Sequence, residues 1–176
     1  MNPHHLVACS HERHAGAILD IFNHAILHST ALYDYKPRTA EQMQGWFAAK
    51  RDGGFPVLGL EDEAGTLLGF ASYGLFRPQP AYKYTMEHSV YIHHSQRGRG
   101  LGRVLMQALI AEARQRDVHA LVGAIDAANL GSRALHEKLG FELVGQLPQV
   151  GFKFGGWLDL VLYQMLLETP LQPVDG

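Results

Sequence analysis

The segment from residue 96 to residue 102 constrains this sequence most. It reads Gln-Arg-Gly-Arg-Gly-Leu-Gly and lies between a stretch of alternating residues (85–93) and a stretch with apolar residues at helical spacing (101–116). Glycine lets the backbone adopt dihedral angles that are costly for other residues and approach a ligand closely. A helix that begins directly after such a turn presents free N–H groups and the positive end of its dipole to an anion. The strand, turn and helix together therefore predict an α/β fold with a phosphate site at this turn.

The predicted phosphate site combines this turn with local positive charge. The chain as a whole carries a formal net charge of -2, so any anion site has to be local. A plain glycine turn with solvated arginines is the alternative interpretation. The G-x-G-x-x-G pattern of dinucleotide folds does not match, and the Gly-Lys-Ser/Thr end of a P-loop is missing. The residues of the predicted site are Arg97, Gly98, Arg99, Gly100, Leu101, Gly102 and Arg103.

Length and composition limit the class of protein. The 176 residues, 47% hydrophobic and 18% charged, predict a single globular domain over residues 1–176, with a core from about residue 5 to about residue 168. The charge balance predicts no nucleic-acid partner, and no apolar run approaches the roughly 18 residues of a membrane span. No signal peptide is evident at the N-terminus. The single cysteine, Cys9, excludes an internal disulfide and suits a cytoplasmic location.

Hydrophobic periodicity predicts a mixed sheet with helices on both faces. The second helix is expected to begin after Thr39, a favourable N-cap residue, and the fourth to stop at Gly140. The predicted order is ααβββαβαββ. Its helices cover residues 12–27, about 40–53, 101–116 and 129–138, and its strands cover residues 56–61, 67–75, 85–93, 120–125, 142–146 and 158–167.

Two segments resemble the cofactor-binding segments of the GCN5-related N-acetyltransferases (GNAT). Arg97-x-x-Gly100-x-Gly102 resembles the loop that binds the pyrophosphate of acetyl-CoA in that family. Asn129-x-x-Ser132 resembles its second cofactor segment. The resemblance implies that the mixed sheet is mostly antiparallel, as in that family. It also implies an acetyltransferase that uses acetyl-CoA as co-substrate, with Asn129 near the pantetheine and Ser132 near the phosphates. Helix capping is the other interpretation of Asn129.

Within the family, the sequence is most similar to the phosphinothricin and methionine sulfone (methionine sulfoximine) acetyltransferases. Residues 85–91 and 148–159 carry that resemblance, and similarity extends from about residue 15 to about residue 167. It implies a small amino-acid-like acceptor amine and a homodimer. An acetyltransferase for protein lysines or N-termini, and a non-catalytic acyl-CoA sensor, are the alternatives.

The reaction that the resemblance implies needs a neutral amine, a polarised carbonyl and a proton for the leaving thiolate. Glu87, on the strand that runs into the glycine-rich turn, is the candidate base, and a solvated strand glutamate is the alternative. His136 stands where many family members carry a tyrosine that is assigned as the acid. Histidine has a pKa near 6.5, so proton donation and a purely packing role both stay open.

The remaining predicted site residues surround the same strand. The resemblance assigns the backbone N–H groups of Val90, Tyr91 and Ile92 to the thioester carbonyl and the pantetheine arm. Arg77 follows a strand end, where a guanidinium suits a bidentate grip on a carboxylate. His88 and Ser89 are expected to line the substrate pocket. No metal is expected, because the eleven histidines show no recognisable ligand spacing.

Overall fold

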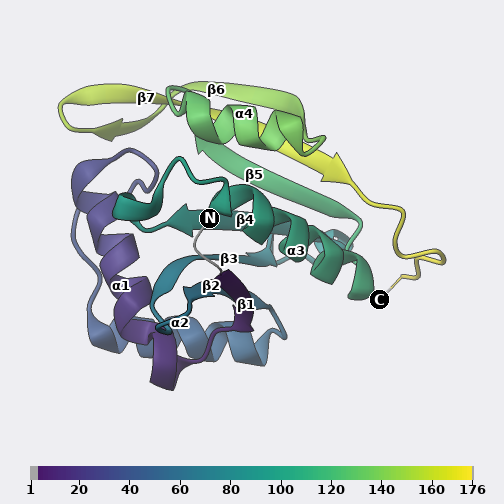
Figure 1. The fold of residues 1–176 in the computed structure, drawn as a ribbon. Helices are drawn as coiled ribbons and strands as arrows, with labels where there is room; N and C mark the ends of the chain where they lie inside the picture. Colours follow the sequence, from purple (N-terminus) through teal and green to yellow (C-terminus); the bar gives the residue numbers. More distant parts are fainter. Residues whose placement is uncertain (1–3, 176) are drawn as a thin grey trace. The chain divides into compact units, whose positions relative to one another are not determined.

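The computed structural model of the protein describes residues 4–175. It has four α-helices, two short 3-10 helices and seven strands in this part of the chain (Figure 1). Residues 1–3, which belong to the segment where no signal peptide was predicted, lie outside the described residues. In chain order the elements are β1 (His4–Ala8), α1 (His11–His28), α2 (Ala40–Asp52), β2 (Val57–Asp62), β3 (Leu67–Leu75), η1 (Pro80–Tyr82), β4 (Thr85–Ile92), η2 (His94–Gln96), α3 (Leu101–Gln115), β5 (Ala120–Asp126), α4 (Leu130–Lys138), β6 (Glu142–Lys153) and β7 (Gly156–Leu166).

The strands form one sheet in the order β1-β2-β3-β4-β5-β7-β6. The pairs β1–β2, β2–β3, β5–β7 and β6–β7 are antiparallel, whereas β4 and β5 pair in parallel from Thr85, opposite Ala120, to Glu87, opposite Val122. The mixed, mostly antiparallel sheet predicted from the sequence is confirmed.

Contacts within the chain divide it into two compact units. One comprises residues 4–73 and 89–109, and the other comprises residues 74–88 and 110–175. The boundary crosses β3, β4 and α3, so each of these elements contributes to both units. We refer to them as the first and the second unit.

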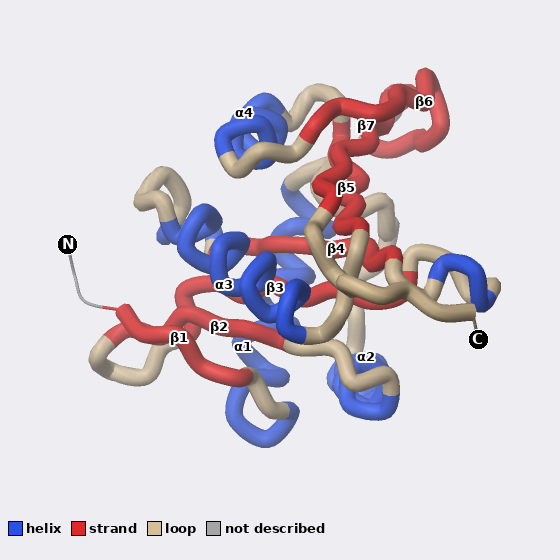
Figure 2. Tube along the Cα trace, turned by 90° about the vertical axis from the view of Figure 1, so that its right-hand side faces the viewer, coloured by secondary structure: helices blue, strands red, loops and turns tan. Residues whose placement is uncertain are grey.

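Helices α1 and α2 pack their apolar faces on strands β2 and β3 in the first unit. Both helices start at a side-chain cap: Ser10 accepts a hydrogen bond from the backbone of Arg13, and Thr39 forms a capping box with Gln42. Figure 2 shows α1 and α2 on one side of these strands and α3 on the other. The core between α1, α2 and the strands consists of Ile18, Ile21, Phe22, Met43, Phe47, Val57, Leu67 and Phe70.

Strands β5 and β7 form the buried centre of the second unit. Leu121 and Tyr163 are both 0% exposed, and Val161, which is opposite Ile125 in the ladder, is 1% exposed. Strand β6 forms the outer edge and keeps most of its side chains exposed. No helix in the described part of the chain is long and apolar enough to cross a membrane.

Two predictions about strands were wrong. Strand β1 was not predicted: its five residues, only partly buried, pair along the edge of the sheet with β2 and show no clear alternation. Strand β6 was predicted to end at residue 146, yet it continues to Lys153. Pro148 is accommodated because the register shifts between Leu147 and Gly151, and an irregularity of this kind tolerates proline in a strand.

Candidate functional site

The glycine-rich turn links β4 to α3 in the first unit. Gly98 and Gly100 have φ angles of 77° and 78°, in the left-handed region. A Cβ atom added at either position would meet nothing within 4 Å, so the backbone conformation, not the available space, requires glycine. A side chain in this conformation costs roughly 1–2 kcal/mol. Helix α3 begins at Leu101, which is 3% exposed and anchors the turn in the core.

The three arginines of the turn are exposed to solvent. Arg97 and Arg99 flank Gly98, and Arg103 lies in the first turn of α3. The Arg99 guanidinium donates a hydrogen bond to the side-chain oxygen of Gln96. The first-turn N–H groups of a helix have no partner within the helix and point outward. The turn therefore offers backbone donors, a helix dipole and positive side chains to one anion.

The end of β4, also in the first unit, offers its backbone rather than its side chains. The ring of Tyr91 packs against Phe22 and Phe70, with centroid distances of 5.2 Å and 5.5 Å. A Cβ atom at Gly69 would lie 2.7 Å from the carbonyl oxygen of Tyr91, so the neighbouring strand approaches closely here. The side chain of Tyr91 therefore packs against the core, which leaves its backbone for the role predicted for Val90, Tyr91 and Ile92.

Glu87 and Arg77, in the second unit, are both exposed. Desolvation raises the pKa of the Glu87 carboxyl group, and the charge of Arg77 opposes that shift. The Arg77 guanidinium lies over the ring of Phe76, 4.5 Å from its centroid, and donates a hydrogen bond of 3.0 Å to the Phe76 carbonyl oxygen. A carboxyl group with a raised pKa and a charged neighbour is a combination that occurs often at functional sites.

His88 and His136 form a buried pair in the second unit. They are 6% and 2% exposed, and their Nε2 atoms lie 2.9 Å apart. His136 Nδ1 lies 2.7 Å from the carbonyl oxygen of Ser132, which can only accept, so Nδ1 carries the proton. His136 Nε2 of the neutral ring then accepts from His88 Nε2–H. His88 Nδ1 is left as a buried acceptor without a partner in the described structure.

This pair holds both rings in the neutral state. Burial, and to a smaller extent His136, lowers the pKa of His88 to about 3, and burial lowers the pKa of His136. A Cβ atom at Gly123 would lie 3.0 Å from the His88 ring, so the strand packs tightly against the pair at this position. The single N–H of neutral His136 is donated to the Ser132 carbonyl oxygen, and His88 is buried against the same ring.

Asn129 is the N-cap of α4. Its side-chain oxygen accepts a hydrogen bond of 3.1 Å from the Ser132 backbone N–H, so Asn129 has the helix-capping role that was one of its two interpretations. Ser132 in turn connects this cap to the histidine pair through its carbonyl oxygen. The structure thus links Asn129, Ser132, His136 and His88 in one chain of hydrogen bonds, and Ser89 is not part of it.

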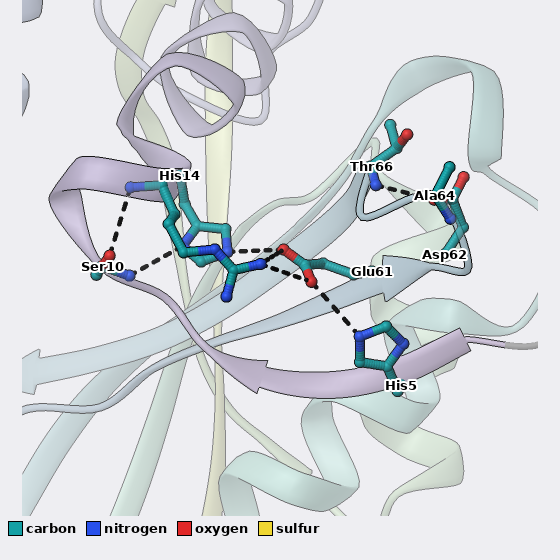
Figure 3. Close-up of polar contacts among 8 residues, drawn as sticks. His5, Ser10, His14, Glu61, Asp62, Ala64 and Thr66 are labelled. Carbon is teal, nitrogen blue, oxygen red and sulfur yellow. Dashed lines mark hydrogen bonds and ion pairs between the residues drawn. The ribbon is translucent and has the colours of Figure 1, made fainter.

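A second polar cluster, in the first unit, was not predicted (Figure 3). Glu61 is 3% exposed and lies 2.9 Å from His14 Nε2, 3.1 Å from the Arg13 guanidinium and 3.5 Å from His5 Nε2. His14 Nδ1 accepts from the backbone N–H of Ser10. The sequence signal was a glutamate inside an apolar strand. The cluster joins β1, α1 and β2, and its polar groups satisfy one another.

The remaining nucleophile and metal candidates show no reactive arrangement. Burial raises the pKa of the Cys9 thiol to about 12, so this thiol is not activated as a nucleophile. Within residues 4–175, no group of three or more histidine, cysteine, aspartate or glutamate side chains is arranged to hold a metal ion.

Comparison with known proteins places this geometry among acetyltransferases. The chain is 48% identical to an L-methionine sulfoximine/L-methionine sulfone acetyltransferase of Pseudomonas paraeruginosa, over 86% of this chain and 88% of that protein. It is 39% identical to a phosphinothricin N-acetyltransferase of Alcaligenes faecalis, over 87% and 78%. A Salmonella typhimurium structure solved with its cofactor acetyl-CoA superposes with a TM-score of 0.93 at 39% identity, covering 98% of each chain.

The sequence profile of the acetyltransferase (GNAT) family matches residues 18–141. That range includes the glycine-rich turn, β4 and α4. The match covers more than half of the chain, and the relatives above match along most of their own length. This protein is a member of the acetyltransferase (GNAT) family.

Proposed function

We propose that this enzyme transfers the acetyl group of acetyl-CoA to the α-amine of a small amino acid or a close analogue. Methionine sulfoximine, methionine sulfone and phosphinothricin are the acceptors that the names of its relatives suggest. The observation that carries the proposal is the turn with two left-handed glycines at the start of α3, in a chain whose relative was solved with acetyl-CoA.

We assign the cofactor's pyrophosphate to the turn from Arg97 to Arg103. Its backbone N–H groups, the α3 dipole and the exposed arginines favour two negative charges there. The backbone of Val90, Tyr91 and Ile92 would pair with the pantetheine arm as an added strand and polarise the thioester carbonyl. Asn129 and Ser132 of α4 complete the proposed cofactor residues, with Asn129 acting through the helix cap.

We assign Glu87 as the general base. The raised pKa of its carboxyl group makes the carboxylate a stronger base than that of an ordinary glutamate. Glu87 takes the proton of the attacking ammonium, directly or through one water. The neutral amine then attacks the thioester carbon and a C–N bond forms. The C–S bond breaks to release the coenzyme thiolate, and the nitrogen of the new amide loses its extra proton to solvent.

The hydrogen bonds of His136 favour a positioning role for it over the acid role. Its Nδ1 proton is donated to the Ser132 carbonyl oxygen, and its Nε2 accepts from His88. A thiolate with a pKa near 8.5 is a good leaving group and can take its proton from water. We therefore propose that the thiolate is protonated by solvent, and that His88 and His136 fix the strand on which Glu87 lies.

Arg77 is the proposed binder of the substrate carboxylate. It is exposed, and its charge acts on Glu87 within the same unit, as expected if carboxylate and amine of one small molecule are held together. Ser89, partly buried on β4, is proposed as a wall of the pocket.

We further propose that the enzyme is a cytoplasmic homodimer. The exposed apolar side chains of the β6–β7 hairpin, among them Val150, Phe154 and Trp157, are candidates for the dimer interface.

Thiol release from acetyl-CoA tests the function. The acceptor panel contains L-methionine sulfone, L-methionine sulfoximine, L-phosphinothricin, ordinary amino acids and a lysine peptide. We expect turnover of the analogues, loss of most kcat in Glu87→Gln, and a raised KM with nearly normal kcat in Arg77→Ala. Glu63→Gln, at an exposed turn position, is the matched control. Turnover of the peptide alone would contradict the proposed substrate class, and tight acetyl-CoA binding without any turnover would favour a sensor.

A further inference from the structure

Four histidines of the first unit lie together just before the glycine-rich turn. His24 and His28 belong to α1, and His93 and His94 follow β4. The rings of His24 and His94 are stacked, with centroids 3.9 Å apart and planes at 7°. The ring centroids of His28 and His24 are 4.7 Å apart, and those of His93 and His94 are 4.3 Å apart. We call these four residues the histidine array; the turn begins at Arg97 on the same chain.

The stacking of the array argues against a metal site. The lone pairs of an imidazole lie in the ring plane, so two parallel rings 3.9 Å apart cannot direct them at one ion. At the same time the array has an unused acceptor, because His24 Nδ1 is covered and has no hydrogen-bond partner in the described structure. His93 Nδ1 accepts from the Ser95 backbone N–H, so the proton of its neutral ring is on Nε2, where it can be donated.

The groups around His24 disfavour protonation of its ring. The groups that act on it are His28 on its own helix, His93 and His94 on the facing segment, and Arg97 in the turn. Partial burial, followed by these positive neighbours, lowers the pKa of His24. Two protonated rings with centroids 3.9 Å apart would repel each other. This repulsion disfavours protonation of both stacked rings at once.

A phosphate bound at the turn would reverse this balance, because its negative charge favours protonated rings nearby. We propose that the histidine array is a proton-dependent phosphate subsite, which takes up a proton from solvent when a nucleoside diphosphate group binds at the adjacent turn. An imidazolium N–H of the array then donates a charge-assisted hydrogen bond to a phosphate oxygen. This inference rests on the proposed function, which places the pyrophosphate of acetyl-CoA at the turn. By linkage, affinity for the diphosphate rises as pH falls.

Calorimetric titration with dephospho-CoA tests the array. This probe keeps the diphosphate but lacks the 3′-phosphate, whose own protonation near pH 6 would mask that of the protein. Titrations in buffers of different ionisation enthalpy give the number of protons taken up. For the native enzyme we expect net proton uptake and an affinity that rises roughly threefold per unit of pH decrease between about pH 8 and about pH 6, where a full proton would give about tenfold.

His94→Gln and His24→Gln are the informative variants. His94 is exposed, so its replacement leaves the core intact, and both variants are checked for unchanged thermal unfolding. We expect each to lose most of the pH dependence and of the proton uptake. His11→Gln is the control: it lies on the same helix outside the array, with its ring edge-on to Phe47 at 5.7 Å. It is expected to behave as the native enzyme.

The outcomes separate this inference from the function on which it rests. Native pH dependence in both array variants, or no proton uptake by the native enzyme, would overturn the inference while acetyl transfer continued. Failure of the native enzyme to bind either dephospho-CoA or acetyl-CoA at any pH would overturn the proposed function, and the inference with it.

Discussion

The Nε2 atoms of His88 and His136 lie 2.9 Å apart inside the second unit. The Ser132 carbonyl oxygen fixes the tautomer of His136, and the tautomer of His136 fixes that of His88. Only one arrangement of protons satisfies both contacts with neutral rings. The pair therefore fixes which nitrogen of each ring carries the proton. The contribution of this hydrogen bond to stability can be measured.

Replacing one ring of the pair is expected to cost more stability than replacing both. In His136→Phe, the His88 Nε2–H loses its acceptor in a buried place, which costs about 1–3 kcal/mol. In the double variant with His88→Phe no buried donor is left unpaired, so part of that loss is recovered. Urea unfolding of the two single variants and the double variant gives the coupling energy. Strictly additive losses would contradict the hydrogen bond.

Acid is expected to destabilise the protein through the same pair. The pKa of folded His88 is lowered to about 3, whereas the unfolded side chain titrates near 6.5. The unfolded state therefore binds more protons between these values, so stability falls as pH is lowered from about 6.5 toward about 3. The predicted loss of stability is checked by urea unfolding. The midpoints of the native protein and of the double variant are measured across this pH range. An unchanged slope in the variant would count against His88 as the source.

Glu61→Gln is expected to lower the free energy of unfolding by about 2 kcal/mol at neutral pH, the value of charged hydrogen bonds. His14, Arg13 and His5 favour the carboxylate, and its pKa is lowered. Its contribution is therefore present above the unfolded pKa and lost as pH falls through that of the folded state. The exposed pair of Arg51 and Asp52 provides the control Asp52→Asn, expected to change little. Equal effects of both variants in chemical unfolding would be incompatible with this account.

Gly100→Ala is expected to weaken acetyl-CoA binding. Its φ of 78° would strain an alanine by roughly 1–2 kcal/mol, and relief of that strain would turn backbone N–H groups away from the phosphates. Gly45→Ala, inside α2 with nothing within 4 Å of the added Cβ, is the control and should stabilise the helix by about 0.5–1 kcal/mol. Titration calorimetry with acetyl-CoA and thermal unfolding distinguish the two. Unaltered affinity in Gly100→Ala would exclude this turn as the pyrophosphate site.

Trp157→Glu is expected to give a monomer if the β6–β7 hairpin forms the proposed dimer interface. Trp157 is 64% exposed in the single chain, and a charge buried at an interface without a partner is strongly unfavourable. Leu171→Glu, at an 88% exposed position beyond β7, is the control. Light scattering gives the mass of each variant. A dimeric Trp157→Glu would point to another interface, and a monomeric native enzyme would refute the homodimer.

The helices and the central strands followed from local sequence. Period and caps placed α1 and α2 within a residue or two, because a cap residue such as Thr39 and an apolar stripe act within the same short segment. Strand β3 was predicted with both ends correct, from residue 67 to residue 75. The prediction for β6 ended too early at Pro148. The strand continues because its register on β7 shifts there, where Asp159 of β7 accepts a hydrogen bond from the Gln149 N–H.

The order of most elements and the glycine-rich turn with its charged residues could be predicted from the sequence, because they depend on neighbours along the chain. The contacts between histidines could not be predicted in this way. His88 joins His136 from a different element, and His24 stacks on His94, because contacts between distant residues depend on how strands and helices pack. The protonation states could not be predicted from the sequence for the same reason. The pKa of a side chain depends on its burial and on its neighbours in space, which are known only from the tertiary structure.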